Sequence, residues 1–177
     1  MNATPTEAES TALRIQALLA QARAQRTSAP ALGALAAAEA VALARPLGDA
    51  DTLARTLSMQ SCCLRQDSQL APAAQTAQEA VALFGTLPEP RSEDLAQAHA
   101  TAHVNHGIAL TMLGRTGDAL QAFEAAREIS RAAGDAVGEA DALLDTAVVA
   151  NMLGEDARAV ALYQAVLPIY WRLGDDY

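Results

Sequence analysis

Apolar residues recur at helical spacing along most of the chain. In the first such stretch they fall at Leu13, Ala17, Leu18 and Ala24, a spacing that is typical of one face of an α-helix. Glycine, proline and short polar stretches interrupt the pattern at intervals and mark turns. The pattern therefore predicts eight helical segments, at about residues 4–24, 31–45, 51–65, 72–84, 92–113, 118–133, 137–153 and 156–173.

Two short sequence features repeat at a fixed interval. The string Glu-Ala-Val-Ala-Leu begins at Glu39 and again at Glu79, forty residues later. A Gly-Asp pair follows a helical stretch at Gly48, Gly134 and Gly174, and the last two pairs are also forty residues apart. A fixed period in this range predicts a repeat architecture. Because short turns make sequential helices antiparallel, we expect the segments to form four hairpins.

Equivalent residues in the second helix of each hairpin set the register. Ala40, Ala80, Ala126 and Val166 occupy this place, at intervals of 40, 46 and 40 residues. The longer middle interval is explained by a proline-rich loop inserted at 85–91. We therefore predict a single solenoid domain over residues 1–177, with repeats at about 6–46, 50–86, 92–133 and 137–173.

The third and fourth hairpins carry a recognisable signature. Each has a small residue midway along the first helix, a glycine at its end, and an alanine followed by an aromatic residue in the second helix. These residues are Gly107, Gly114, Ala119 and Phe123 in the third hairpin, and Ala147, Gly154, Ala159 and Tyr163 in the fourth. The arrangement resembles the tetratricopeptide repeat family. In the second hairpin, Ser68 stands where the turn glycine is expected.

The resemblance implies a fold and a mode of action. Tetratricopeptide repeats stack into a right-handed superhelix whose concave groove is lined by the first helices and binds a protein or peptide. The 40-residue period is similar to long variants found in bacterial signalling proteins. Each implied groove residue has an alternative role as a buried contact between repeats. The implied residues are Leu18, Ala22, Arg55, Ser58, Cys62, Thr101, Val104, Asn105, Ile108, Met112, Asp141, Leu144, Asp145, Val148, Asn151 and Met152.

Composition agrees with a helical chain and narrows the possible partners. Hydrophobic residues make up 51% of the chain but aromatic residues only 3%, and the abundant Ala and Leu favour helix. The net charge is −9, and every basic residue is an arginine. Without a basic cluster we expect no nucleic-acid partner and no attraction to anionic membranes. No stretch of about 20 apolar residues predicts a membrane span, and we expect a cytoplasmic protein.

Candidate chemistry is sparse. His99, His103 and His106 share one stripe of a predicted helix, where two of them could form half of a zinc site or all could be packing residues. The adjacent Cys62 and Cys63 could bind a soft metal or sense oxidants, or be small buried residues. The chain carries no phosphate-binding loop, metalloprotease motif or nucleophile elbow. We therefore expect no enzyme activity, no cofactor and no metal.

The last predicted helix is unusually aromatic for this chain. Tyr163, Tyr170 and Trp171 lie along it, and we expect them to pack on further repeats, on another domain, or on a second copy in a homodimer. The leading interpretation is a non-enzymatic scaffold or adaptor that binds a protein or peptide. Two alternatives stay open. One is the sensory N-terminal region of a larger bacterial signalling enzyme, such as a diguanylate cyclase. The other is a metal-responsive regulator that uses the histidines.

Overall fold

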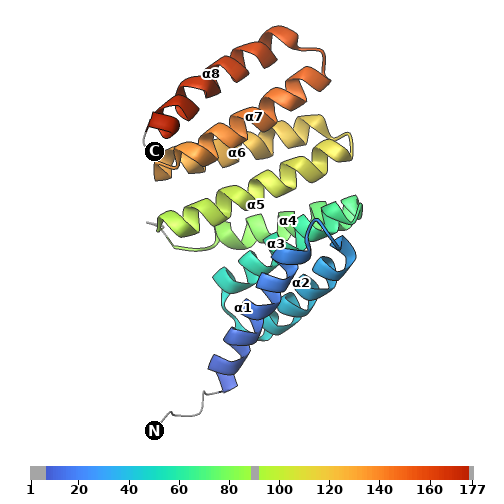
Figure 1. The fold of residues 1–177 in the computed structure, drawn as a ribbon. Helices are drawn as coiled ribbons and strands as arrows, with labels where there is room; N and C mark the ends of the chain where they lie inside the picture. The colour runs from blue at the N-terminus through green and yellow to red at the C-terminus, as the bar shows by residue number, and fades with distance from the viewer. Residues whose placement is uncertain (1–6, 89–91, 176–177) are drawn as a thin grey trace. The chain divides into compact units, whose positions relative to one another are not determined.

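The chain is helical throughout the part that its computed structural model describes, which is residues 7–88 and 92–175, with side chains as far as residue 172. Over these ranges there are eight α-helices, one short 3-10 helix (η1, Arg45–Leu47) and no strand (Figure 1). The predicted all-α fold is therefore confirmed. The helices are α1 Glu7–Gln25, α2 Pro30–Ala44, α3 Ala50–Gln66, α4 Leu70–Gly85, α5 Glu93–Met112, α6 Thr116–Ala133, α7 Ala136–Met152 and α8 Asp156–Asp175.

The helix bounds lie within two residues of the predicted ones wherever both ends are described. Part of the predicted N-terminal cap, residues 4–6, lies outside the described residues. Left-handed backbone ends three of the helices at Gly114, Gly134 and Gly154, with φ of 77°, 74° and 74°, which glycine adopts without steric cost. Ser68 takes the same conformation, with φ of 61°. The turn between α3 and α4 therefore keeps the family's geometry without its glycine.

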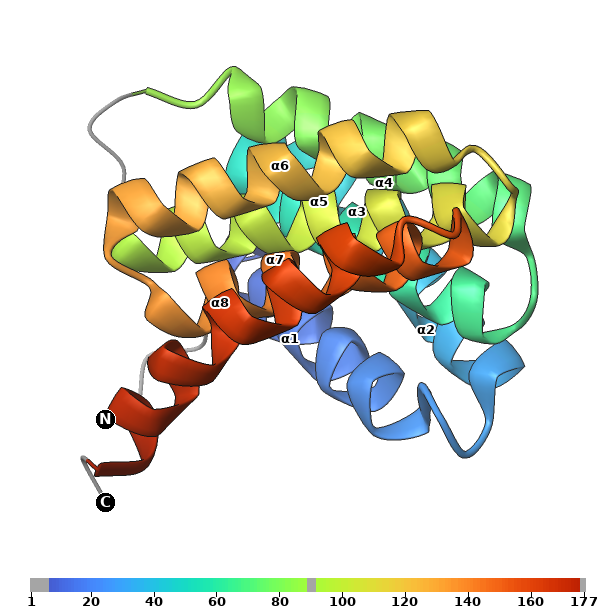
Figure 2. The same ribbon diagram turned by 90° about the horizontal axis from the view of Figure 1, so that it is seen from above.

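The helices form two compact units, residues 1–84 and 85–177. The first contains the hairpins α1/α2 and α3/α4, and the second contains α5/α6 and α7/α8 (Figures 1 and 2). The division falls at the start of the loop predicted at 85–91. A single solenoid domain over the whole chain stays a prediction, and each unit is described below by itself.

The core of the first unit is built mainly of alanine. Ala22, Ala37 and Ala40 have no exposed surface, and they pack with Ile15 and Leu18. Small side chains allow helices to approach closely. A Cβ atom at Gly33 would lie 3.2 Å from the carbonyl oxygen of Ala22, so α1 and α2 are nearly in backbone contact.

The two Glu-Ala-Val-Ala-Leu strings lie in the second helices, α2 and α4. Their second residues, Ala40 and Ala80, are fully buried. Their glutamates form exposed ion pairs, Arg14 Nη2 with Glu39 Oε1 and Arg45 Nη1 with Glu79 Oε1, each 2.8 Å long. Exposed pairs of this kind add at most about 1 kcal/mol. The strings are therefore structural, and burial explains the repetition of their first alanine.

An aromatic residue organises the core of the second unit. Phe123 of α6 is 1% exposed and packs with Leu110, Ala119 and Val149. A Cβ atom at Gly107 would lie 2.5–2.8 Å from three carbon atoms of the Phe123 ring. Real side chains do not approach this closely, so Phe123 requires glycine at position 107. The pair joins two residues of the predicted sequence signature, the small residue of α5 and the aromatic residue of α6.

One described segment, Pro30–Leu47, is long and apolar enough to cross a membrane by length and composition alone. The expectation from the sequence was that no stretch would meet this test. The segment covers α2 and η1, and α2 contributes seven buried residues to the first unit. A core helix passes the same test, so the finding is weak evidence for a membrane span.

Candidate functional site

The first unit contains a cavity of about 250 Å³ between α1 and α3. Residues from one face of α1 form one wall, and the start of α3 with the turn before it forms the other. Both are the first helices of their hairpins. The lining residues are Ala12, Ile15, Gln16, Leu19, Leu47, Asp49, Thr52 and Arg55.

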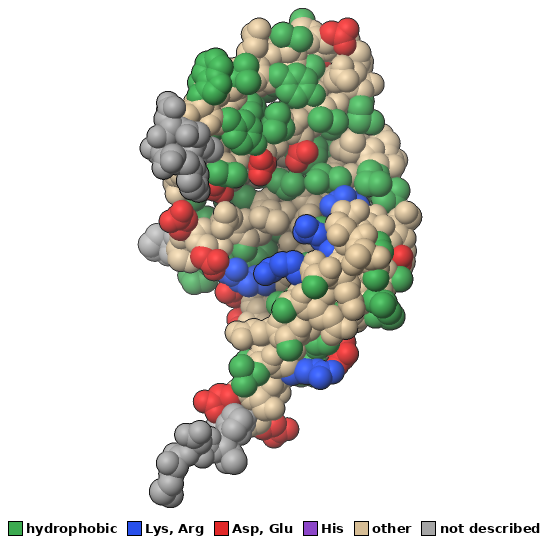
Figure 3. Space-filling view, viewed as in Figure 1, with side chains coloured by type: hydrophobic (Ala, Val, Ile, Leu, Met, Phe, Trp, Pro, Cys, Tyr) green, Lys and Arg blue, Asp and Glu red, His purple; other side chains and the backbone are tan. Residues whose placement is uncertain are grey.

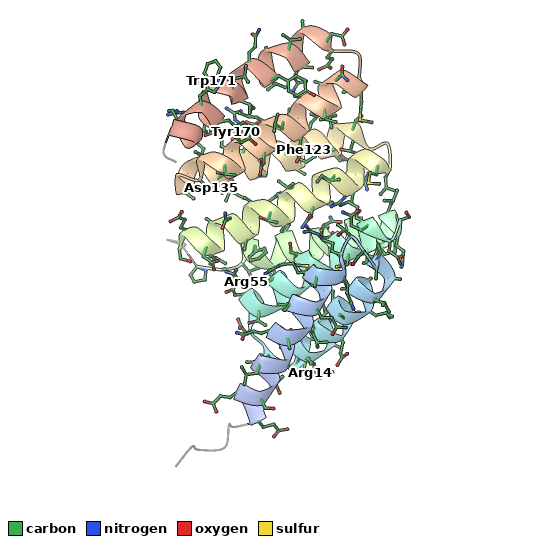
Figure 4. All side chains as sticks on the ribbon, in the orientation of Figure 1. Arg14, Arg55, Phe123, Asp135, Tyr170 and Trp171 are labelled. Atoms are coloured by element: carbon green, nitrogen blue, oxygen red, sulfur yellow. The ribbon has the colours of Figure 1, made fainter. Side chains whose placement is uncertain are left out.

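The second unit contains a cavity of about 180 Å³ between α5 and α7. The end of α6 and the start of α7 close it on one side, and α5 forms the other wall. Asp135, which lines it, is labelled at the start of α7 in Figure 4. The lining residues are Gln97, Ala100, Thr101, Val104, Ser130, Asp135, Val137, Gly138 and Asp141.

The two cavities occupy the same place in the repeat. Asp135, Gly138 and Asp141 each follow their counterparts in the first cavity, Asp49, Thr52 and Arg55, by 86 positions. The repeat anchors Ala40 and Ala126 are separated by the same interval. The four lining residues of α5 follow those of α1 by 85 positions, in the pairs 12/97, 15/100, 16/101 and 19/104. The cavity is therefore a recurring feature of this fold.

An aspartate begins the helix beside each cavity. Asp49 Oδ1 accepts a hydrogen bond from the Asp51 amide at 3.1 Å, and its Oδ2 accepts one from the Thr52 hydroxyl at 2.5 Å. The Thr52 hydrogen bond, with further backbone bonds, lowers the pKa of Asp49 despite some desolvation. In the second unit, Asp135 Oδ1 accepts from the Gly138 amide at 2.9 Å. These contacts fix both carboxylates as helix caps.

The glycine at position 138 makes room for polar groups. A Cβ atom there would clash with Asp135 Oδ2 and Ser130 Oγ. The equivalent Thr52 of the first unit fits because its hydroxyl donates directly to Asp49. The two units thus use the same cap with different supporting residues.

The two units carry opposite charges at one pair of equivalent positions, Arg55 in the first unit and Asp141 in the second. In the first unit, Arg55 Nε lies 2.6 Å from Asp51 Oδ1, so an acidic neighbour one helical turn away balances the cation. In the second unit, Asp141 Oδ1 accepts a hydrogen bond from the Tyr170 hydroxyl at 2.9 Å. Desolvation, this hydrogen bond and the Asp141 charge raise the pKa of Tyr170. The second cavity has two carboxylates and no basic residue in its lining.

Ser130 is the most unusual residue of the second cavity. Its side chain is buried, with 1% of the residue exposed, and its Oγ has no hydrogen-bond partner. Leaving a buried hydroxyl unsatisfied costs about 1–3 kcal/mol. The equivalent residue of the first unit is Ala44, which is fully buried and apolar. At this pair of equivalent positions, a polar side chain is therefore present only in the second unit.

Four of the predicted groove residues line the cavities: Arg55 in the first unit, and Thr101, Val104 and Asp141 in the second. The others divide by burial. Five are buried among the helices and offer little surface to a partner: Leu18, Ala22, Ser58, Cys62 and Asn105. Three are half-buried: Ile108, Leu144 and Asp145. Four are exposed but line neither cavity: Met112, Val148, Asn151 and Met152.

The cavities cover only part of the predicted groove, and the rest of the groove stays a prediction. On α3 and α7 the cavities lie at the first turns, whereas the predicted set extended to the helix ends. The missed lining residues include the capping aspartates Asp49 and Asp135. The repeated Gly-Asp pairs at Gly48 and Gly134 were the signal that could have found them. Asn105 and Ser58 are buried, which fits the alternative role of a contact among the helices that the sequence analysis left open for each groove residue.

The histidine stripe lies on α5. His99 is buried, and its ring centroid is 5.0 Å from that of His103. Burial lowers the pKa of His103 to about 4, with smaller contributions from the neighbouring His99 and His106. Burial, together with Arg115, also lowers the pKa of His106. Among the described residues, no group of three His, Cys, Asp or Glu side chains is placed to hold a metal ion.

The adjacent cysteines have different surroundings. Both are free and buried. Burial raises the pKa of Cys63 to about 11, and its thiol faces the carbonyl oxygen of Ala22 at 3.8 Å. The sulfur of Cys62 instead accepts contacts from Arg26 Nη1 at 3.8 Å and Arg65 Nη2 at 3.7 Å. Cys63 therefore stays a neutral packing residue, as one of the two interpretations expected.

An apolar stripe along α8 is exposed in the second unit. Val160, Tyr163, Leu167 and Trp171 are spaced at helical intervals and are 39–68% exposed. Hydrophobic side chains gather over α7 and α8 in Figure 3, with acidic side chains among them, and Figure 4 labels Tyr170 and Trp171 near the end of α8. Association through Tyr163, Tyr170 and Trp171 stays a prediction.

Comparisons with known proteins agree with the repeat pattern. Residues 98–170 match the tetratricopeptide repeat family. The crystal structure of BtubC (BKLC) from P. vanneervenii aligns with a TM-score of 0.59 and 17% sequence identity. That alignment covers 96% of this chain and 59% of the length of BtubC, and at this identity it concerns the fold alone. No curated protein matches the chain at a significant level.

The two findings support different parts of the prediction. The structural alignment extends the helical-repeat fold over nearly the whole chain. The family match is confined to the α5–α8 region, where the signature residues are found. Tetratricopeptide repeats are in general protein-interaction modules. Residues 98–170 carry the sequence signature of the tetratricopeptide repeat family.

Proposed function

We propose that the chain is a non-enzymatic module that binds a protein or peptide segment on the faces of its first helices, and so acts as a scaffold or adaptor. The observation that carries this proposal is the recurrence of one cavity at equivalent positions in both units. Both cavities lie between the first helices of their hairpins, which are the helices that line the binding groove in this family. Two free buried cysteines suit a reducing compartment, so we also propose that the protein is cytoplasmic.

The sizes of the cavities favour side chains over small molecules as occupants. Volumes of about 250 and 180 Å³ fall below the roughly 300–1,000 Å³ that is usual for small-molecule sites. Each cavity suits one long side chain of a bound segment. Apolar and polar groups line both, as expected where a peptide is held through alternate side chains.

A displayed random-peptide library, selected on the immobilised intact chain, tests the proposal. Thr101→Trp fills the second cavity from an exposed position on α5. Gln121→Trp, on an exposed position of α6 outside both cavities, is the matched control. We expect enriched peptides whose affinity falls at least about tenfold, or 1.4 kcal/mol, with Thr101→Trp. The control should leave the affinity unchanged. Failure to enrich any peptide, or equal binding to both variants, would overturn the proposal.

The exposed stripe of α8 favours a second candidate role, association with a second copy of the chain. Its side chains Val160, Leu167 and Trp171 are about half or more exposed, and contiguous apolar surface of this kind marks interaction sites. Sedimentation velocity of the wild type and of a Leu167→Glu/Trp171→Glu variant tests it. A concentration-dependent dimer that the variant abolishes is expected. A wild-type monomer at all concentrations would refute this role.

A further inference from the structure

We propose that the cavity of the second unit is a subsite for a basic side chain, arginine or lysine, of the bound protein segment. This inference rests on the proposed function and specifies the partner's chemistry at one place. It is carried by three observations on the cavity between α5 and α7: its charge, its unpaired buried hydroxyl and its shape.

The charge of the lining is wholly negative. Asp135 and Asp141 enter the cavity from the first turns of α7, and no arginine or histidine is among the lining residues. Asp135 uses Oδ1 for the Gly138 amide, and Asp141 uses Oδ1 for the Tyr170 hydroxyl. A carboxylate offers about four acceptor positions. Both residues therefore retain the capacity to accept further hydrogen bonds from a cation.

The unpaired hydroxyl of Ser130 is the independent sign of a ligand. Ser130 lines the cavity, is 1% exposed, and its Oγ lies against Gly138 and Asp135 without a hydrogen-bond partner. A buried acceptor of this kind is costly unless something satisfies it. An incoming N–H group that reaches the floor of the cavity would supply the missing bond. The absence of a hydroxyl at Ala44, the equivalent residue of the first unit, ties this feature to the acidic cavity.

The shape suits a long side chain with a charged end. Ala100, Val104 and Val137 provide apolar wall for a methylene stem, which basic side chains bury while their charged groups find polar partners. A guanidinium binds carboxylates in paired hydrogen bonds, and an ammonium does so as a point charge. The volume of about 180 Å³ holds one such side chain.

The first unit supplies a control within the same molecule. Its equivalent cavity carries Arg55 where the second carries Asp141, with Asp51 balancing the arginine. It should therefore reject a cationic side chain. Thr52 and Gly138 are equivalent positions, and their amide signals report on the two cavities.

The experiment is an NMR titration of the intact chain with N-acetyl-arginine amide, which mimics an arginine residue without charged termini. N-acetyl-citrulline amide is the neutral control of the same shape. We expect saturable shifts of the Gly138 and Thr101 amides with the arginine probe, with a dissociation constant on the order of millimolar. The citrulline probe and the Thr52 amide should show no saturation. Higher ionic strength should weaken the binding.

Two variants separate a specific site from general attraction to an acidic protein. Asp141→Asn keeps the acceptor for Tyr170 but removes the charge, and should weaken arginine binding at least about fivefold. Glu128→Gln removes the same charge from an exposed position of α6 outside the cavity and should have no effect. Equal responses to both probes, equal effects of both variants, or no shift at Gly138 would overturn the inference.

The peptide selection distinguishes this inference from the proposed function. If peptides are enriched and depend on Thr101 but carry no excess of arginine or lysine, the binding module stands and the basic subsite fails. If arginine amide binds the cavity but no peptide is enriched, the subsite stands as a cation site and the peptide-binding proposal fails.

Discussion

The two units of this chain place a cavity at the same point of the repeat and line it with different chemistry. The backbone register is kept to within one residue over an interval of 85 or 86 positions. Three pairs of equivalent positions differ in chemistry between the first and the second unit: Arg55 and Asp141, Ala44 and Ser130, and Thr52 and Gly138. The comparison teaches that the fold sets where a cavity forms, while a few side chains set the chemistry of its lining.

The cores differ in a parallel way. The first unit relies on alanines, and Ala37 stands where the second unit has Phe123, an interval of 86 positions. At this place the second unit fits the ring of Phe123 against Gly107, whereas the buried aromatic residue of the first unit, Phe84, comes from the end of α4. Little volume is concentrated in the side chain of Ala37. The aromatic core concentrates its packing in one contact, which makes it the place where mutation should cost most.

The largest expected effect is therefore Phe123→Ala. Removing a fully buried aromatic ring should lower the free energy of unfolding by about 3–5 kcal/mol through lost burial and the cavity left behind. Hydrogen exchange on the intact chain should show lost protection in α5–α8 and little change in α1–α3. Equal loss in both units, or a cost below about 1 kcal/mol, would contradict the picture of a core centred on this residue.

A matched set of variants checks that the cost comes from the contact with Gly107. Gly107→Ala alone should destabilise by about 1–3 kcal/mol because the new methyl group meets the ring. In a Phe123→Leu background, where the ring is gone, the same substitution should cost clearly less. Additive effects of the two changes would show that the ring and the glycine act independently.

The next largest effect is expected from a fall in pH. It should destabilise the second unit more than the first, because all three histidines lie on α5. Burial holds the pKa of His103 at about 4, against 6.5 for the exposed side chain. Between these values the unfolded chain binds a proton that the folded chain excludes, so the free energy of unfolding decreases as the pH falls. Linkage gives a loss of up to about 3 kcal/mol across this window.

Denaturant unfolding of the wild type and of His103→Gln at pH 7 and pH 4.5 measures this effect. The wild type should lose more stability than the variant on acidification, with α5 the first helix to lose hydrogen-exchange protection. The change should be negligible above pH 7, where His103 is neutral in both states. Identical pH profiles for the two proteins would refute a role for His103.

The turn at Ser68 gives the smallest of these effects. Its equivalent in the second unit is Gly154, 86 positions later, and both residues have left-handed backbone. This conformation costs a residue with a side chain about 1–2 kcal/mol. Glycine avoids that cost, but its greater conformational freedom in the unfolded chain offsets part of the advantage. Ser68→Gly should therefore stabilise by roughly 0.5–1 kcal/mol, and Gly154→Ser should destabilise by a similar amount. Thermal unfolding of both variants checks the pair, and a lower melting temperature for Ser68→Gly would be the contrary result.

Much of the fold could be predicted from the sequence because its signals are local. Alanine and leucine favour helix, and residues such as Gly114 and Gly134 end helices wherever they occur, so the helix bounds were accurate. The family pattern also singled out Gly107 and Phe123 as signature residues, although their contact was seen only in the structure. These features depend on neighbours in sequence or on one contact within a hairpin.

The cavities depend on contacts that the sequence pattern does not encode. Whether Asp135 and Asp141 face α5 is decided by how α7 is rotated against its neighbour, and a rotation of part of a turn buried Asn105 and left Asn151 outside the cavity. The unpaired state of Ser130 depends on how its hydroxyl is oriented beside Gly138 and Asp135, which only a three-dimensional arrangement can show. The interval of 86 positions was present in the Gly-Asp pairs, but its meaning for a site required the structure.

The most direct test of the central claim is a double-mutant cycle on binding. One mutation is Asp141→Asn in the chain, and the other is arginine to citrulline in the tightest peptide from the selection, with affinities measured by calorimetry for all four combinations. If the peptide's arginine occupies the cavity of the second unit, the two changes should be coupled by at least about 1 kcal/mol. Additive losses would contradict the claim, because they would show that the arginine and Asp141 do not meet.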